Sequence, residues 1–176
     1  MIICDSREQK NAHILRYFER HNVPYVVRGM ETADYMIEGQ PNIVVDRKQD
    51  LGEVCSNLTY KGKRADENDG KEIPSNVARF MKEVRRAYAD GIRLVVLIEH
   101  GENVKCLADV AAWGGSRSGI SGRRLLNEMD RLTAAYGVEW QFCTKAETAA
   151  KILEILGYKG GENDDKQSDH NGAACG

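Results

Sequence analysis

Residues 33–48 read ADYMIEGQPNIVVDRK, and this stretch decides the fold. β-branched and aromatic side chains fill 34–37 and 42–47, which predicts two strands. Glycine and proline lie between them, within 39–42, and predict a turn. We therefore expect a β-hairpin over residues 34–47, with three consecutive charged residues at the end of its second strand.

Hydrophobic periodicity predicts the elements on either side of the hairpin. Apolar runs predict further strands over 2–5, 25–28, 94–98 and 138–142. Helical spacing predicts helices over 11–21, 76–89, 121–136 and 144–156. Ser121 and Gly137 mark the start and the end of the third helix. The order β-α-β-β-β-α-β-α-β-α predicts an α/β domain with a mixed central β-sheet flanked by helices.

The length of 176 residues suits one domain with a tail. Apolar residues make up 41% and charged residues 30%, which is the balance of a globular protein. We expect a domain over 1–157, with a mobile charged loop over 60–75 and a glycine-rich loop over 114–122. Beyond it, 158–176 is rich in Gly, Asp, Asn, Lys and Ser and is predicted to be disordered.

Composition also excludes several classes of protein. No apolar run approaches the ~20 residues that span a bilayer, and the N-terminus lacks the features of a signal peptide. The five cysteines are scattered without a CxxC pair, which argues against a disulfide framework and a zinc site. We expect an intracellular, cytoplasmic protein without a membrane partner. The formal charge of −2 counts mildly against nucleic acid, because many DNA-binding proteins are basic.

Charged residues with a chemical use concentrate in the predicted hairpin. Residues two apart on a strand point to the same face, so Asp46 and Lys48 project together and Arg47 projects to the other side. The hairpin brings Asp34 alongside them. Two carboxylates and one ammonium then share one small surface, although a charged strand end facing solvent would show the same pattern.

That trio suits the hydrolysis of a phosphodiester bond. Mg²⁺ takes one or two carboxylates besides waters and phosphate oxygens, so Asp34 and Asp46 are candidate ligands for Mg²⁺, with Mn²⁺ as a substitute. A bound metal polarises the phosphate and lowers the pKa of a water. Lys48 would orient that water or offset charge on the phosphorus. The spacing fits the loose pattern of restriction-type nucleases.

Further segments occur in a fixed order around this trio. They are Asp5-Ser6-Arg7-Glu8, Ala33-Asp34-Tyr35, Val45-Asp46-Arg47-Lys48 and Leu97-Ile98-Glu99. With this ordered set the chain resembles the nuclease domain of the XPF family of structure-specific endonucleases, in the compact single-domain form found in phage and bacterial genomes. The resemblance covers about residues 2–100.

The resemblance implies a restriction-endonuclease-like fold and metal-dependent cleavage of branched or flapped DNA, in repair, recombination or phage replication. It implies that Asp34 and Asp46 bind the metal and that Lys48 is the catalytic lysine. Arg47 would support the site. Asp5, Arg7 and Glu8 would flank it. A homodimer is a further expectation, since members of the family often dimerise.

The chain departs from the family pattern at several positions. Ala33 stands where the family has glycine, and Asp46 stands where it has the longer glutamate. The family's acidic position three residues beyond the triplet falls on Gly52, for which Asp50 or Glu53 could substitute. We expect no tandem helix-hairpin-helix module, which grips duplex DNA in larger relatives, in the residues after 157, so the preferred DNA structure and cut site stay open.

Basic residues in the two predicted loops are candidates for contacts with phosphate. They are Lys61, Lys63 and Arg64 in the first, and Arg117, Arg123 and Arg124 in or beside the second. Ordinary solvated loops have the same composition. Arg79 and Glu83 share one face of a predicted helix, where a surface ion pair is the usual explanation. The resemblance adds a role facing the site as the alternative.

Several functions compete with a structure-selective endonuclease. One is a non-catalytic DNA-binding partner of the same fold, against which the intact Asp34, Asp46 and Lys48 argue. Another is a Holliday-junction resolvase-like nuclease or a recombination exonuclease. The last is a structural module on which the acidic pair is only surface charge.

Overall fold

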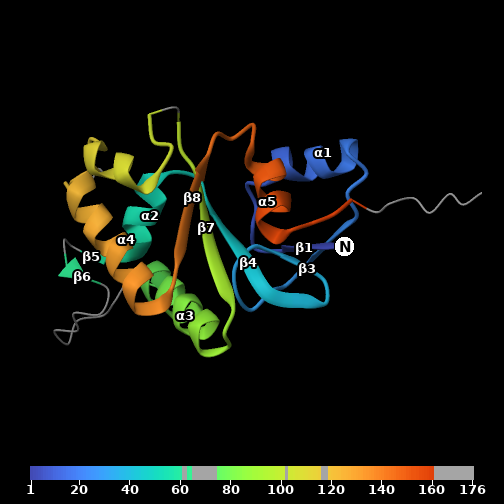
Figure 1. The fold of residues 1–176 in the computed structure, drawn as a ribbon, viewed down its shortest axis with the longest axis horizontal. Coiled ribbons are helices and arrows are strands. Elements are labelled where there is room, and N and C mark those ends of the chain that lie inside the picture. Colours follow the sequence, from blue (N-terminus) through green and yellow to red (C-terminus); the bar gives the residue numbers. More distant parts are fainter. Residues whose placement is uncertain (61–62, 65–74, 102, 116–118, 161–176) are drawn as a thin grey trace, which may run out of the picture.

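A mixed six-stranded β-sheet forms the centre of the protein, with helices on both faces (Figure 1). The computed structural model describes residues 1–60, 63–64, 75–101, 103–115 and 119–160. The architecture confirms the predicted α/β class.

The strands of the central sheet lie in the order β2-β1-β3-β4-β7-β8. They are β1 (Ile2–Asp5), β2 (Tyr25–Arg28), β3 (Tyr35–Ile37), β4 (Gln40–Lys48), β7 (Arg93–Glu99) and β8 (Glu139–Cys143). β3 runs antiparallel to β1 and β4, and the other neighbours are parallel. Because β4, β7 and β8 are parallel, their carboxyl ends meet at one edge of the sheet, where Lys48 lies beside Ile98.

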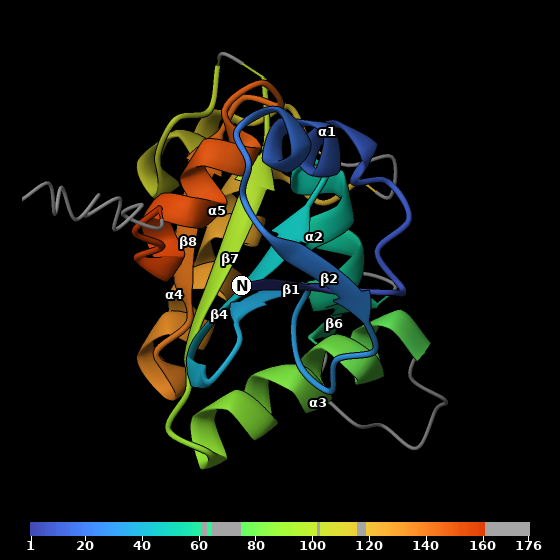
Figure 2. The ribbon, with the colours of Figure 1, turned by 90° about the vertical axis from the view of Figure 1, so that its right-hand side faces the viewer.

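Helices divide between the two faces of the sheet (Figure 2). The helices are α1 (Ala12–Arg20), α2 (Leu51–Leu58), α3 (Ser75–Ala89), α4 (Gly122–Tyr136) and α5 (Thr148–Leu156), with a 3₁₀ helix η1 (Leu107–Ala112). α1 and α5 pack together on one face, over Val45 and Leu97. α2, α3, α4 and η1 cover the other, over Val44 and Val96. None of the described helices is long and apolar enough to cross a membrane.

The alternating side chains of β4 explain this division. Val44 belongs to the α2/α3 core and Val45 to the α1/α5 core, as period-two alternation requires. The same alternation continues into the charged end of the strand, so the choice of face for Val44 also sets the face for Asp46 and Lys48. The predicted pairing of β3 with β4 is present, with Tyr35 opposite Val45.

The turn of the hairpin differs from the prediction. β4 begins at Gln40, and the strands are joined through Glu38 and Gly39, not through residues 39–42. Gly39 has a φ of 77°, a conformation that only glycine adopts readily, so it forms the turn without help from Pro41. Pro41 is instead the second residue of β4, where it is extended and exposed.

Helix α2 was missing from the predicted order. Its sequence signal is short but present, because Leu51, Val54, Cys55 and Leu58 are buried at helical spacing. Asp50 caps it by accepting a hydrogen bond from the Glu53 N–H at 2.8 Å.

The predicted mobile loop over 60–75 also differs where the structure describes it. Thr59–Tyr60 (β5) and Lys63–Arg64 (β6) pair as a short antiparallel ribbon, and α3 begins at Ser75. Thr59 and Tyr60 have the β-branched and aromatic side chains that favour a strand, and Gly62 lies between the two strands. The predicted mobility of 65–74 and most of the predicted tail, 161–176, fall outside the described residues.

The end of the glycine-rich loop has a packing role. α4 begins at Gly122, which approaches η1 so closely that a Cβ atom there would overlap the Val110 carbonyl oxygen and lie 2.8 Å from the Trp113 carbonyl oxygen. Ser121 caps this helix and Gly137, with a φ of 69°, ends it, as predicted. The glycine therefore allows α4 and η1 to pack as one layer.

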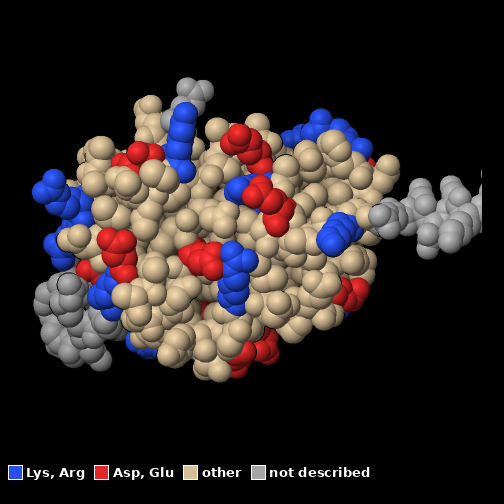
Figure 3. All heavy atoms as spheres, viewed as in Figure 1, with Lys and Arg blue, Asp and Glu red and all other residues tan. Residues whose placement is uncertain are grey.

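Charged side chains are interspersed by sign on the face of the molecule that Figure 3 shows, with wide uncharged areas between them. The described residues of this face therefore form no extended patch of a single sign.

We predict that Gly122→Ala lowers the free energy of unfolding by about 1–3 kcal/mol, the usual effect of overpacking. The matched control is Gly114→Ala, because a Cβ at Gly114 meets no atom within 4 Å. Urea denaturation of both variants measures the difference. Equal stabilities would contradict the packing role of Gly122.

Candidate active site

The predicted catalytic residues all line one pocket at the carboxyl end of β4. They are Asp5, Arg7, Glu8, Asp34, Asp46, Arg47 and Lys48. The loop after β1 supplies one wall, and Arg79 and Glu83 on α3 supply another. Carboxylates outnumber cations in this lining by six to five, so the pocket is a region of negative charge.

Three consecutive charged side chains are buried at the end of β4. Asp46, Arg47 and Lys48 are 3%, 2% and 5% exposed. Asp46 and Lys48 lie on the α2/α3 face, where Lys48 Nζ is 2.8 Å from Asp46 Oδ1 and 5.3 Å from the centre of the Phe80 ring. Arg47 points to the α1/α5 face. The predicted alternation of these residues is therefore present.

Asp34 joins the pair through the backbone of the hairpin. It directly precedes β3 and its Oδ2 accepts a hydrogen bond from the Arg47 N–H at 2.8 Å. The preceding Ala33 is buried with a φ of 61°, a left-handed conformation that favours glycine. This conformation gives a physical reason for the glycine that the family pattern places there.

Two carboxyl groups of the pocket, Asp34 and Glu83, have raised pKa values. Burial raises the pKa of Asp34 well above its ordinary value, and the neighbouring Asp46 carboxylate raises it further. Burial, followed by Asp46, also raises the pKa of Glu83. For Lys48, burial lowers the pKa, but Asp46 and Asp34 together outweigh it and the net pKa is raised. Lys48 stays a cation that does not fully neutralise the carboxylates around it.

The donor set of the pocket fits a divalent metal ion. Both oxygens of the buried Asp46 carboxylate lie close to Lys48 Nζ, Oδ2 at 2.6 Å and Oδ1 at 2.8 Å, and the Asp34 carboxyl group is near enough for Asp46 to raise its pKa. Within the described ranges no group of three or more His, Cys, Asp or Glu side chains is placed to hold a metal. A metal here would be held by Asp34 and Asp46, and Mg²⁺ is commonly bound by so few carboxylates, with waters and phosphate oxygens completing its shell. Such an ion would polarise a phosphate and acidify a bound water.

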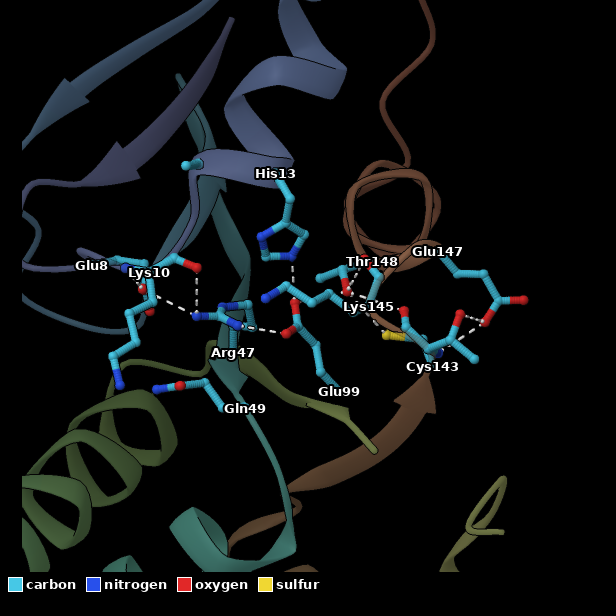
Figure 4. Close-up of polar contacts among 12 residues, drawn as sticks. Glu8, Lys10, His13, Arg47, Gln49, Glu99, Cys143, Lys145, Glu147 and Thr148 are labelled. Carbon is cyan, nitrogen blue, oxygen red and sulfur yellow. Dashed lines mark hydrogen bonds and ion pairs between the residues drawn. The ribbon is translucent and has the colours of Figure 1, made fainter. Parts of the chain in front are cut away.

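Arg47 is anchored on the opposite face of the sheet by a network that Figure 4 shows. Its guanidinium lies 2.8 Å from Glu99 Oε2 and 3.1 Å from Glu8 Oε1. Glu99 Oε1 in turn lies 2.7 Å from His13 Nε2 and accepts a hydrogen bond from the Thr148 hydroxyl at 2.8 Å. The Arg47 N–H binds the Asp34 carboxylate. The side-chain contacts of Arg47 on the opposite face of the sheet therefore help to fix the position of that carboxylate.

Asp5 and Arg7 organise the wall of the pocket. Asp5 Oδ2 accepts a hydrogen bond from Arg7 Nε at 2.8 Å, and Oδ1 accepts from the N–H groups of Arg7 and Met30. Arg7 also donates to the Met30 carbonyl at 2.6 Å. Both Asp5 oxygens are thus engaged in joining the end of β1 to the segment after β2.

The acidic residues proposed to replace the family position at Gly52 have different places. Asp50 is the cap of α2 and does not line this pocket. Glu53 lines it, and its Oε2 accepts a hydrogen bond from the Gln49 N–H at 2.9 Å. Of the two, Glu53 is therefore the one whose position suits the site.

The predicted DNA-binding residues of the loops are not part of this pocket where the structure describes them. Arg123 and Arg124 are exposed at the start of α4, which packs against η1, α2 and α3, and neither residue lines the pocket. Arg117, Lys61 and the side chains of Lys63 and Arg64 lie outside the described residues. Cations that the sequence did not single out, Lys10 and Lys82, lie in or beside the pocket.

The model of the ERCC4 domain matches residues 4–156. The chain belongs to the ERCC4 domain family. This match confirms the predicted resemblance to XPF nucleases, although the phage or bacterial origin stays a prediction.

Among solved structures, "XPF from Aeropyrum pernix, complex with DNA" has a TM-score of 0.58 and 17% sequence identity over 88% of this chain. The chain spans 62% of the length of that structure. At this identity the likeness shows a shared fold, and it confirms the predicted restriction-endonuclease-like architecture. No curated protein matches the chain significantly.

We predict that Asp34→Asn stabilises the metal-free protein increasingly as pH rises. The folded state raises the pKa of Asp34, so it holds a proton that the unfolded chain has lost, and stability falls as pH rises from the ordinary aspartate pKa through the raised one. The variant has no such titration. The free energy of unfolding of the variant, relative to that of the native chain, should therefore increase between the ordinary and the raised pKa and stay constant above the raised one.

Denaturation in EDTA at a series of pH values measures this difference, with Asp90→Asn as the control because Asp90 is exposed at the end of α3. A difference in stability between the variant and the native chain that does not change with pH would contradict the raised pKa of Asp34.

Proposed function

We propose that the chain is a divalent-metal-dependent DNA endonuclease, with Mg²⁺ as the metal and Mn²⁺ as a substitute. The observation that carries the proposal is the convergence of Asp34, Asp46 and Lys48 in one pocket with an excess of carboxylates. Membership of the ERCC4 domain family supports it, since the pocket lies at the positions by which the chain resembles XPF nucleases.

The predicted catalytic residues have distinct parts in this proposal. Asp34 and Asp46 hold the metal, and the Arg47 N–H fixes the orientation of Asp34. Lys48 stays charged, so its ammonium offsets negative charge that develops on the phosphate during cleavage. Glu8 and Asp5 act indirectly, because their carboxylates hold Arg47 and Arg7.

Cations beside the pocket suit a nucleic-acid substrate. Arg7, Arg79 and Lys82 line a groove that continues from the pocket along α3, where Arg86 is paired with Glu31 at 3.0 Å. Contacts from such residues to phosphates position a duplex or a strand without reading its sequence. We extend the proposal to branched or flapped DNA in repair, recombination or phage replication. An intracellular location and a homodimer are parts of the same proposal.

A cleavage assay tests the proposal with labelled flap, fork, four-way-junction and plain duplex DNA, each in Mg²⁺, Mn²⁺ or EDTA. We predict metal-dependent cutting that falls at least about 100-fold in Asp46→Asn, since losing even an outer-shell partner of a metal costs about 10–100-fold. The control is Asp90→Asn, which is exposed, does not line the pocket and should cut like the native chain.

The possible results separate the competing functions. Cutting that persists in Asp46→Asn would overturn the assignment of the site. Binding of DNA without cutting of any substrate would favour the non-catalytic partner. A marked preference for the four-way junction would favour a resolvase-like nuclease.

A further inference from the structure

A second pocket lies at the same edge of the sheet, on the face that α1 and α5 cover. We call it the α1/α5 pocket. Its cationic lining consists of Lys10, Arg16, Arg47 and Lys145, with His13 beside them. It shares Lys10, Arg47 and Gln49 with the catalytic pocket, so the two pockets adjoin at the end of β4.

The carboxylates of the α1/α5 pocket are already engaged. Glu99 contacts Arg47 and His13 and accepts a hydrogen bond from Thr148. Asp50 accepts the capping hydrogen bond of α2. Against these two carboxylates stand four permanent cations, so the lining has a net positive charge before His13 is counted. Its charge is therefore opposite to that of the catalytic pocket.

The side chains of Lys10, Arg16 and Lys145 make no ion pair with any carboxylate among the residues that the structure describes. Arg16 Nε donates only to the Ala12 carbonyl, at 3.1 Å. Figure 4 shows that Lys10 and Lys145 come from opposite sides of Arg47, from the loop after β1 and from the turn before α5. Segments far apart in the sequence thus place unneutralised cations around one space.

Two features make this space suitable for a phosphate group. Arg47, 2% exposed and held by Glu8 and Glu99, is a fixed cation in its wall. α1 begins at Ala12 in the lining, and the Asn11 side chain makes no capping hydrogen bond, so the positive end of the helix adds to the same field. Fixed cations with free side chains above them are the usual means of binding phosphate.

We propose that the α1/α5 pocket binds a phosphate of the DNA strand at a position beside the bond that is cut. The inference rests on the proposed function and deepens it, because it gives the substrate a second anchor across the end of β4 from the metal ligands. Because Lys10 and Gln49 line both pockets, one DNA strand would be able to reach both of them. The anchoring phosphate is either internal to the strand or at its 5′ end.

Fluorescence anisotropy of labelled DNA in EDTA, at a series of salt concentrations, tests the inference with the double variant Arg16→Ala/Lys145→Ala. Each phosphate contact contributes about 0.9 to the slope of log K against log salt. We expect the magnitude of the slope to fall by about one and the affinity to fall several-fold. The matched control is Arg20→Ala, because Arg20 lies one turn further along α1, is exposed and lies outside the pocket.

An unchanged slope in the double variant, or an equal fall in Arg20→Ala, would overturn the inference. The measurement needs no cleavage, so a fall in slope for a chain that never cuts DNA would support the phosphate pocket while the proposed nuclease fails. Strands with a 5′-phosphate and with a 5′-hydroxyl separate the two sources. An equal effect on both supports an internal phosphate, and an effect confined to the first supports a terminal one.

Discussion

The structure depends on the burial of three charged side chains in succession at the end of one strand. Asp46, Arg47 and Lys48 each lose water on folding, and an ion in such a place is costly unless it is paired. Alternation on β4 sends the carboxylate and the ammonium to one face and the guanidinium to the other, so two separate sets of partners are needed. Phe80 and Asp34 belong to the first set, and Glu8, Glu99 and His13 to the second.

This constraint explains why two pockets of opposite charge adjoin at one edge of the sheet. The α2/α3 face gathers carboxylates around Lys48, and the α1/α5 face gathers cations around Arg47. The backbone N–H of Arg47 links them, because it binds Asp34 while the side chain is held from the opposite face. Replacing such ions by apolar groups often stabilises a protein, so we attribute their presence to chemistry and not to stability.

Local sequence patterns predicted those features of the structure that local backbone geometry determines. The strand that contains Val44 and Val45 and the shared face of Asp46 and Lys48 follow from period-two alternation, and the ordered segments around them led to the correct family. The α2 helix was not predicted because its apolar pattern extends over only eight residues. No sequence pattern could place His13, Thr148 and Lys145 near Arg47, since α1, α5 and β4 meet only through tertiary packing. Loop composition pointed to Arg123 and Arg124, whereas the cations beside the site come from other elements.

In the proposed function, Asp34 and Asp46 together form a metal site. The most direct measurement is the anomalous diffraction of a crystal soaked in Mn²⁺. We predict a peak in the catalytic pocket within coordination distance of one oxygen from each carboxylate, about 2.0–2.1 Å for the corresponding Mg²⁺ complex. A pocket without a peak at saturating Mn²⁺, or a peak that contacts neither Asp34 nor Asp46, would contradict it.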